Sequence, residues 1–320
     1  MSHPDTSGEV SRSGDCPASP RQPVLERIET RDAEVGDGLV VRRALPHRQR
    51  RMVGAWCFLD HLGPVDFEAG HGLAVGPHPH IGLQTFTWLI EGEVVHRDSL
   101  GNEQTIRPGQ VNLMSAGGGI SHAEDSPEGR GGRLHAVQLW IALDEAHRHG
   151  PPAFRHHPVL PVIARDGFGI TLLTGSAFGE TSPVEVFSPL VAMDLAARGG
   201  ASADVTLEPS FEYAVLVLAG EAGIEGARFA PGALCYLGRG RASLALHTDA
   251  AAHLVLIGGE PFGEEILLWW NFVARTPEEM KAATADWNAR RRFGTVRGSP
   301  SRPLVAPDVS KLRLRASKAG

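Results

Sequence analysis

Two pairs of side chains that can bind a metal stand about forty residues apart in the first half of the chain. His78 and His80 flank a proline in GPHPHIG, and His122 and Glu124 follow a glycine-rich turn in SAGGGISHAEDSP. Within each pair the spacing is i and i+2, which places both side chains on one face of an extended strand. Pro79 donates no backbone hydrogen bond, so the first pair belongs at a strand end or on an edge strand. The pattern predicts two neighbouring strands that aim three imidazoles and one carboxylate at one point.

Such a ligand set suits a divalent transition metal. Three neutral imidazoles and a carboxylate leave coordination positions open, which favours catalysis or ligand capture over a purely structural role. We expect one metal per chain, first of all ferrous iron, Fe(2+), with Mn, Ni, Cu or Zn as alternatives. Calcium and magnesium fit poorly, because they prefer shells made only of oxygen atoms.

The other histidines are weaker candidates for metal ligands. His96 and Asp98 in VVHRDS are also spaced i and i+2, and we expect them to serve the fold or to lie behind the ligands. Others are expected to lie in or beside loops, namely His61, His71, His147, His149, His156 and His157. Only His247 and His253 fall in the second half, where SFEY stands at the place of GPHPHIG. A histidine-built centre is therefore expected in the first half alone.

Short apolar runs separated by turn residues must position these side chains. The chain of 320 residues contains 38 glycines and 23 prolines, which favours many short strands over long helices. Residues 85–102, TFTWLIEGEVVHRDSLGN, are typical of a hairpin. Residues 211–238 repeat the strand–turn–strand pattern of residues 83–117. The sequence thus predicts an all-β protein built from two similar barrels.

Composition excludes several classes of function. A net charge of −6 and three widely spaced cysteines argue against a nucleic-acid-binding surface, a disulfide framework and a CxxC zinc site. We expect no signal peptide, because the first residues contain no apolar core, and no apolar stretch approaches the roughly 20 residues of a membrane span. We expect a cytoplasmic, monomeric protein that contacts neither membrane nor nucleic acid.

The expected organisation follows from shifts in composition. We expect a disordered tail over residues 1–22, a metal-binding barrel over 23–148 and a proline-rich linker over 149–161. A metal-free barrel with a helix is expected over 162–293, followed by a flexible tail over 294–320.

One segment near the end predicts a helix. In TPEEMKAATADWNARRRFG, Thr276 is a candidate N-cap and Pro277 occupies the first helical position. Met280, Ala283 and Trp287 are spaced three and four apart, as one helix face requires. We expect this apolar stripe to dock across both barrels and tie them together.

The segment GPHPHIGLQTFTWLIEGEVVHRDSLGNEQTIRPGQVNLMSAGGGISHAE resembles the N-terminal signature of the pirin family, within the cupin superfamily. CFLDHLGP and GEPFGEEILLWWNFVARTPEEM match that family as well, so the resemblance covers residues 24–293. It implies two cupin (jelly-roll) barrels packed face to face, with a mononuclear metal, usually iron, in the first. The family's ligand positions fall on His78, His80, His122 and Glu124.

The chain departs from many pirin-like sequences beside the ligands, at Ile81, Leu83, Gln84 and Gly118. These positions often carry a basic residue, an aromatic residue, Glu and a basic residue respectively. The ligands are retained, whereas the wall of the pocket differs.

The resemblance implies two classes of function. Several pirins are described as quercetin 2,3-dioxygenases, which open a flavonol ring with O2. In such a reaction the 3-hydroxyl of the flavonol loses a proton, and Glu124 is placed to accept it. The alternative is a non-enzymatic protein whose redox-sensitive metal regulates transcription or a metabolic enzyme through protein contacts.

Overall fold

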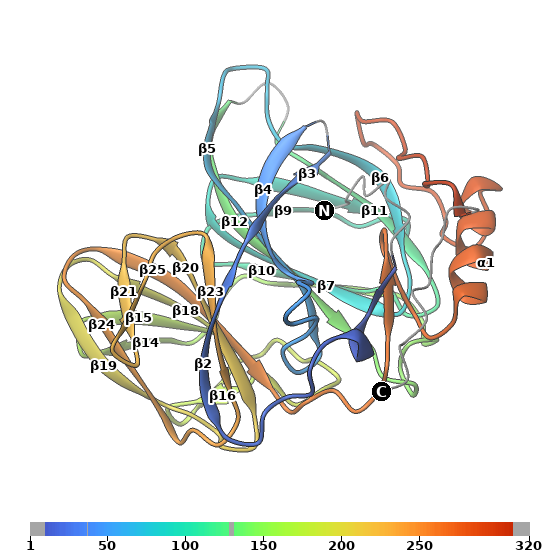
Figure 1. Ribbon diagram of the computed structural model, residues 1–320. Coiled ribbons are helices and arrows are strands. Elements are labelled where there is room, and N and C mark those ends of the chain that lie inside the picture. The colour runs from blue at the N-terminus through green and yellow to red at the C-terminus, as the bar shows by residue number, and fades with distance from the viewer. Residues whose placement is uncertain (1–9, 37, 128–130, 310–320) are drawn as a thin grey trace.

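The computed structural model describes residues 10–36, 38–127 and 131–309, which form two β-barrels (Figure 1). Each barrel pairs a seven-stranded sheet with a four-stranded sheet, and the second repeats the plan of the first. The all-β expectation is therefore confirmed. In this part of the chain no helix has the length and apolar character that a membrane span needs.

In the first barrel, the large sheet has the order β13 (Ala153–His157), β10 (Val111–Ser115), β7 (Leu83–Glu91), β12 (Gly132–Ala142), β5 (Trp56–Phe67), β4 (Leu39–Leu45) and β3 (Arg31–Val35). The small sheet has the order β6 (Ala74–His80), β11 (Ile120–Asp125), β8 (Val94–Asp98) and β9 (Glu103–Ile106).

In the second barrel, the large sheet has the order β14 (Val162–Arg165), β15 (Phe168–Thr174), β18 (Leu190–Ala197), β25 (Ala252–Gly259), β20 (Glu212–Ala219), β23 (Ala233–Gly238) and β2 (Pro23–Glu29). The small sheet has the order β19 (Ala201–Thr206), β24 (Ser243–Thr248), β21 (Ala222–Ile224) and β22 (Ala227–Phe229). A short hairpin joins β16 (Ser176–Ala177) to β17 (Glu180–Thr181).

The two large sheets pack face to face through a shared apolar core. Phe86 and Trp88 enter this core from the first barrel, and Leu216 and Tyr236 enter it from the second. Trp88 also donates from Nε1 to Asp194 Oδ1 across the interface, at 2.9 Å. Burying large aromatic side chains from both sheets supplies most of the driving force for their association.

Two strands cross the expected boundaries. β2 pairs with β23 of the second barrel, although residues 23–148 were expected to build the first. β13 lies within residues 149–161, the expected linker, and pairs with β10. Strand character is readable from local pattern, whereas the partner of a strand depends on distant residues. β13 also covers an edge of β10 that would otherwise expose unpaired backbone groups.

The described part of the N-terminal tail is ordered against expectation. Ser11 and Arg12 form β1, which pairs with β26 (Leu267–Trp269), and β26 pairs in turn with β27 (Phe272–Ala274). The rest of that expected tail, residues 1–9, lies outside the described residues.

The helix forms as predicted but docks on the first barrel only. α1 spans Pro277–Asn288, and the Thr276 hydroxyl accepts a hydrogen bond from the backbone N–H of Glu279. Met280 and Ala283 are fully buried in a cluster that includes Phe272 of β27. Figure 1 shows α1 on the side of the first barrel that faces away from the second. The expectation that the helix ties the barrels together is therefore wrong, because its short stripe is already covered by β27 and its neighbours.

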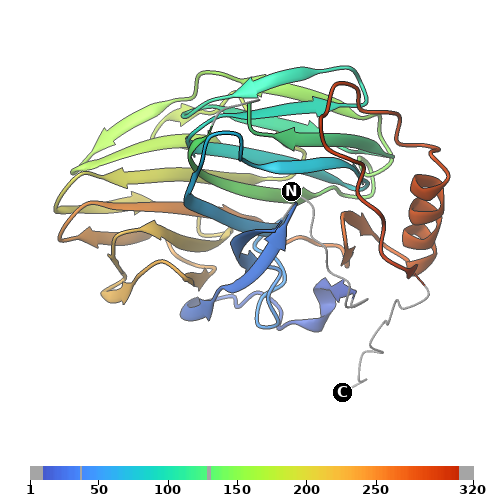
Figure 2. The ribbon, with the colours of Figure 1, turned by 90° about the horizontal axis from the view of Figure 1, so that it is seen from above.

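Residues 294–309 follow the surface of the first barrel, against the expected flexible tail; residues 310–320 lie outside the described residues. Leu304 donates its backbone N–H to Pro77 O at 2.9 Å, and its carbonyl accepts from Trp287 Nε1 at 2.9 Å. The Ser301 hydroxyl donates to Asp125 Oδ1 at 2.8 Å. Figure 2 shows this segment beyond α1 folding back along the barrel. It covers β6 and β11, the strands that carry the predicted ligands.

Ending the chain after Gly298 should lower the free energy of unfolding by about 2–4 kcal/mol, the scale of several hydrogen bonds and a buried apolar contact. Urea denaturation measures this change. As a control, a chain that ends after Val309 keeps the contacts of Ser301 and Leu304 and should unfold at a higher urea concentration than the chain that ends after Gly298. Identical curves for all three chains would contradict a stabilising role for this segment.

Candidate metal centre

Pairing between β6 and β11 brings the two predicted ligand pairs together. His122 stands directly opposite His78 in the antiparallel register, and Ile120 stands opposite His80. A bulge between His122 and Glu124 shifts the register. The expectation that the two motifs lie on neighbouring, paired strands is thus confirmed.

The three imidazoles converge inside the first barrel. His80 Nε2 lies 3.1 Å from His122 Nε2, and the ring centroids of His78 and His122 are 4.3 Å apart. Nitrogen atoms of the three rings all lie within 4.8 Å of one another, a spacing that could hold a metal ion. Glu124, His122 and His96 form a second such group. All three predicted histidines have an exposed fraction of 0% and Glu124 one of 3%, so the centre is shielded from bulk water.

Backbone carbonyls fix the orientation of two of these rings. His78 Nδ1 lies 2.8 Å from Gly76 O, and His80 Nδ1 lies 2.9 Å from Asn271 O. A carbonyl can only accept, so each Nδ1 must carry the proton and each Nε2 keeps a lone pair. His78 Nε2 is buried and has no hydrogen-bond partner among the described residues. A bound cation would satisfy this atom, so the residues present fit a metal.

Burial keeps these imidazoles neutral. It lowers the pKa of His80 to about 3, and together with the neighbouring imidazoles it lowers the pKa of His78 and of His122 well below the usual value. Neutral imidazole is the form that coordinates metals, so no proton has to leave before binding at neutral pH.

The opposite wall of the barrel carries polar groups that were not predicted from the sequence as part of the site. Gln138 pairs in register with Thr87, and Thr87 Oγ1 lies 2.9 Å from Gln138 Oε1 and 3.3 Å from Glu124 Oε1. Two buried donors, Gln138 Nε2 and Trp140 Nε1, have no acceptor among the described residues. The Trp140 ring lies edge-on to His80, with centroids 5.1 Å apart. The sequence does contain an indication of this role for Gln138, because it is a polar residue in the apolar run AVQLWIAL.

Several histidines lie elsewhere. His61 was expected beside a loop, but it is buried on β5, with Nε2 at 2.8 Å from His135 Nε2. His253 contacts Asp194 at 2.6 Å, and the exposed His247 contacts Asp249 at 2.9 Å. Gly63 and Pro64 indicated a loop after His61, but β5 continues through both residues.

The stability of the metal-free protein should fall as the pH drops from about 6.5 towards 3. Burial, with the neighbouring imidazoles, lowers the pKa of His61 to about 3 and that of His135 to about 4. The unfolded chain binds these protons at about pH 6.5, so acid favours unfolding, by about 1.4 kcal/mol per pKa unit at most.

Urea denaturation at a series of pH values measures this dependence. The variant His61→Gln should show a shallower loss between about pH 6 and 4, since it lacks one of the titrating groups. His247→Gln, at an exposed site, should keep the slope of the natural chain. If the stability of His61→Gln fell with pH as steeply as that of the natural chain, His61 would not be one of the groups that cause the loss.

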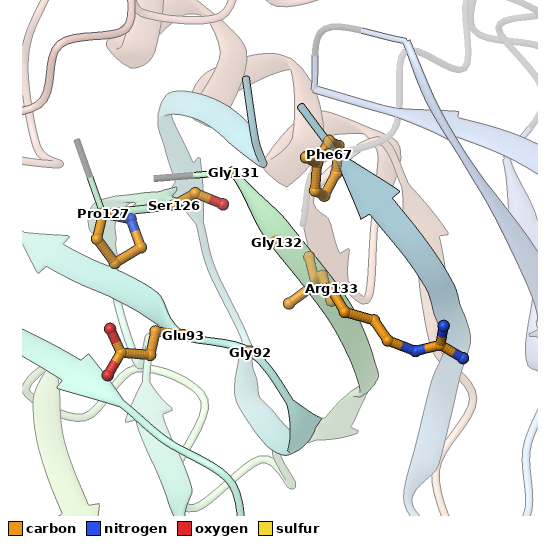
Figure 3. A pocket seen from close by; sticks show the side chains of 9 residues that line it. Phe67, Gly92, Glu93, Ser126, Pro127, Gly131, Gly132 and Arg133 are labelled. Carbon is orange, nitrogen blue, oxygen red and sulfur yellow. The ribbon is translucent and has the colours of Figure 1, made fainter. Parts of the chain in front are cut away.

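A surface pocket nearby is distinct from this centre. Figure 3 shows it beside Phe67, the last residue of β5, and Gly132, the first residue of β12. Its volume is about 210 Å³. Its described lining consists of Phe67, Gly92, Glu93, Ser126, Pro127, Gly131, Gly132, Arg133 and Leu134. None of the four predicted ligands is among these described residues, so the pocket is separate from the metal centre.

Comparisons with known proteins agree with this architecture. Residues 38–141 match the model of the family Pirin, and residues 192–294 match that of the Pirin C-terminal cupin domain. Over 311 residues the chain is 50% identical to a Pseudomonas aeruginosa protein named "Putative quercetin 2,3-dioxygenase PA1205", with 97% of this chain and 98% of that protein covered.

Two solved structures show the same fold. A quercetin 2,3-dioxygenase from Acinetobacter baumannii superposes with a TM-score of 0.88 at 48% identity, covering 92% of this chain and 98% of that one. The bacterial pirin YhhW from Escherichia coli, in complex with nickel(II), has a TM-score of 0.58 at 22% identity, covering 74% of this chain and 100% of that one. The barrels, the convergent histidines and these matches together establish that the chain belongs to the pirin family and has its two cupin domains.

Proposed function

We propose that this protein is a mononuclear metal-dependent dioxygenase that opens flavonols such as quercetin with O2. The observation that carries the proposal is the convergence of ring nitrogens from His78, His80 and His122 in the closed interior of a barrel, with the Glu124 carboxylate grouped with His122. The quercetin dioxygenase names of the two relatives near 50% identity support the choice of substrate class.

The proposed ligands are His78, His80, His122 and Glu124. Ferrous iron is the first expectation, and nickel, manganese, copper and zinc also accept this mixture of nitrogen and oxygen ligands. When bound, the metal supplies a Lewis acid for the oxygen atoms of the flavonol and a redox partner for the reaction with O2.

The protein groups have separate tasks in this reaction. Glu124 is both a proposed ligand and the group that accepts the proton of the 3-hydroxyl, because a carboxylate at the metal can reach a substrate that binds there. The Thr87 hydroxyl contacts Oε1 of Gln138, which leaves Nε2 of that amide to donate elsewhere. Gln138 Nε2 and Trp140 Nε1 are the donors that we assign to the substrate's oxygen atoms, and the buried site excludes competing water.

Anaerobic titration of the iron-loaded protein with quercetin tests the proposal. The absorption band of the flavonol should shift on binding, and admission of air should then consume O2 and flavonol in equal amounts. Flavone, which lacks the 3-hydroxyl, is the control and should cause neither change. Failure of the iron-loaded protein to bind or turn over any flavonol would contradict the enzyme and favour the regulatory alternative.

A further inference from the structure

The third histidine of the centre is oriented by a side chain rather than by the backbone. His78 and His80 each present Nδ1 to a backbone carbonyl, whereas His122 Nδ1 lies 3.3 Å from Nδ1 of His96. His96 comes from β8, the strand on the other side of β11, and its exposed fraction is 3%. A fourth imidazole therefore stands directly behind His122.

His96 is itself held on two sides. Its Nε2 lies 3.2 Å from Asp98 Oδ2, and its ring stacks on Phe154, with centroids 4.2 Å apart and planes 10° apart. Asp98 is buried in turn and accepts hydrogen bonds at Oδ1 from the backbone N–H of Leu100 at 2.9 Å and of Asn102 at 3.1 Å. The Asn102 side chain also donates to Asp98, at 2.8 Å from Oδ2. Neither His96 nor Asp98 is free to swing away.

One assignment of protons satisfies the hydrogen bonds that join Asp98, His96 and His122. The Asp98 carboxylate can only accept, so His96 must carry its proton on Nε2 and keep a lone pair on Nδ1. His96 Nδ1 then accepts the proton that His122 carries on Nδ1. His122 consequently keeps its lone pair on Nε2, the atom that faces His80 Nε2 at 3.1 Å.

We propose that His96 and Asp98 are positioning residues that fix His122 in its metal-binding tautomer. This inference rests on the metal site of the proposed function. Hydrogen-bond partners of ligating histidines hold the ring and raise its basicity, and their loss typically costs 10–100-fold in metal affinity. His96 does not bind the metal in this scheme, because its Nδ1 lone pair is used by His122.

Two replacements of similar size at residue 96 distinguish the hydrogen bond that orients His122 from the packing of the His96 ring. Asparagine places a carbonyl oxygen near the position of Nδ1 and can still accept from His122, whereas leucine cannot. Both lose the ring stacked on Phe154 and the contact with Asp98. Nickel(II) alone is the probe, with its dissociation constant measured by competition against a chromogenic chelator. His96→Leu should weaken binding 10–100-fold, and His96→Asn should stay within about threefold of the natural chain.

A third variant changes only the proton pattern. In Asp98→Asn the side-chain amide replaces Oδ2, donates to His96 Nε2 and moves the proton of His96 to Nδ1. Two N–H groups then face each other between His96 and His122, and we expect about tenfold weaker nickel binding. The melting temperature of the metal-free variant should remain within a few degrees of the natural chain, since the substitution keeps size and shape.

The second barrel offers a matched control. His247 and Asp249 form the same His-x-Asp arrangement, with Nε2 and Oδ1 2.9 Å apart, at an exposed site. His247→Leu and Asp249→Asn should leave nickel affinity unchanged. Equal affinities for His96→Leu and His96→Asn, whether both weak or both natural, would overturn the inference alone. A natural chain that binds no nickel and no iron would overturn the inference together with the proposed function.

Discussion

The variant His122→Ala is expected to carry no metal after anaerobic reconstitution with Fe(II), whereas the natural chain is expected to carry about one metal per chain. His122 supplies the nitrogen that lies 3.1 Å from His80 Nε2, and it belongs to both groups of side chains that could hold an ion. Its removal leaves two imidazoles and a carboxylate around a void. The loss should exceed the roughly 10–100-fold that a residue behind the ligands costs. Elemental analysis of the desalted protein gives the metal content directly.

The controls for this experiment come from the second barrel. His247→Ala and His253→Ala should retain the full metal content, because these residues contact Asp249 and Asp194 rather than the centre. A comparable loss of metal in either control would contradict a single centre in the first barrel. Circular dichroism of each variant shows whether a loss of metal reflects a loss of fold.

The candidate ligands could be grouped in pairs from the sequence because the geometry within each pair is local. The alternation of side chains along a strand puts His78 and His80 on one face whatever the rest of the chain does, and the same holds for His122 and Glu124. Only one long-range fact was needed, the pairing of β6 with β11. The hairpin predicted over residues 85–102 is wrong, because β7 pairs with β10 and β12 in the large sheet, whereas β8 pairs with β11 and β9 in the small sheet.

Features that depend on distant partners were not predictable in this way. Nothing in the local sequence of β2 indicates that it pairs with β23 more than two hundred residues later. The apolar stripe of α1 predicted burial correctly, but a stripe does not specify which surface buries it. Asn271 orients His80 through a backbone carbonyl, and every residue has one, so its sequence carries no signal for that role.

The variant Glu124→Gln is expected to bind iron more weakly than the natural chain, yet detectably, and to lose flavonol turnover by about 10²–10⁴-fold per bound iron. Glutamine keeps a carbonyl oxygen as a ligand, although a neutral one. Its amide cannot accept the proton of the 3-hydroxyl at neutral pH. The range is that for removal of a positioned general base.

Dividing the rate by the bound iron separates the two roles of Glu124. If the carboxylate only tunes the metal, turnover follows iron occupancy and the rate per iron equals that of the natural chain. If it is the base, the rate per iron falls even in fully loaded protein. Glu212→Gln is a suitable control, because Glu212 is a buried carboxylate of the second barrel that accepts from the backbone N–H of Gly54. That variant should lower stability, through the buried hydrogen bond that it weakens, and leave turnover per iron intact. Equal rates per iron for Glu124→Gln and the natural chain would remove the base from the mechanism and leave the metal centre in place.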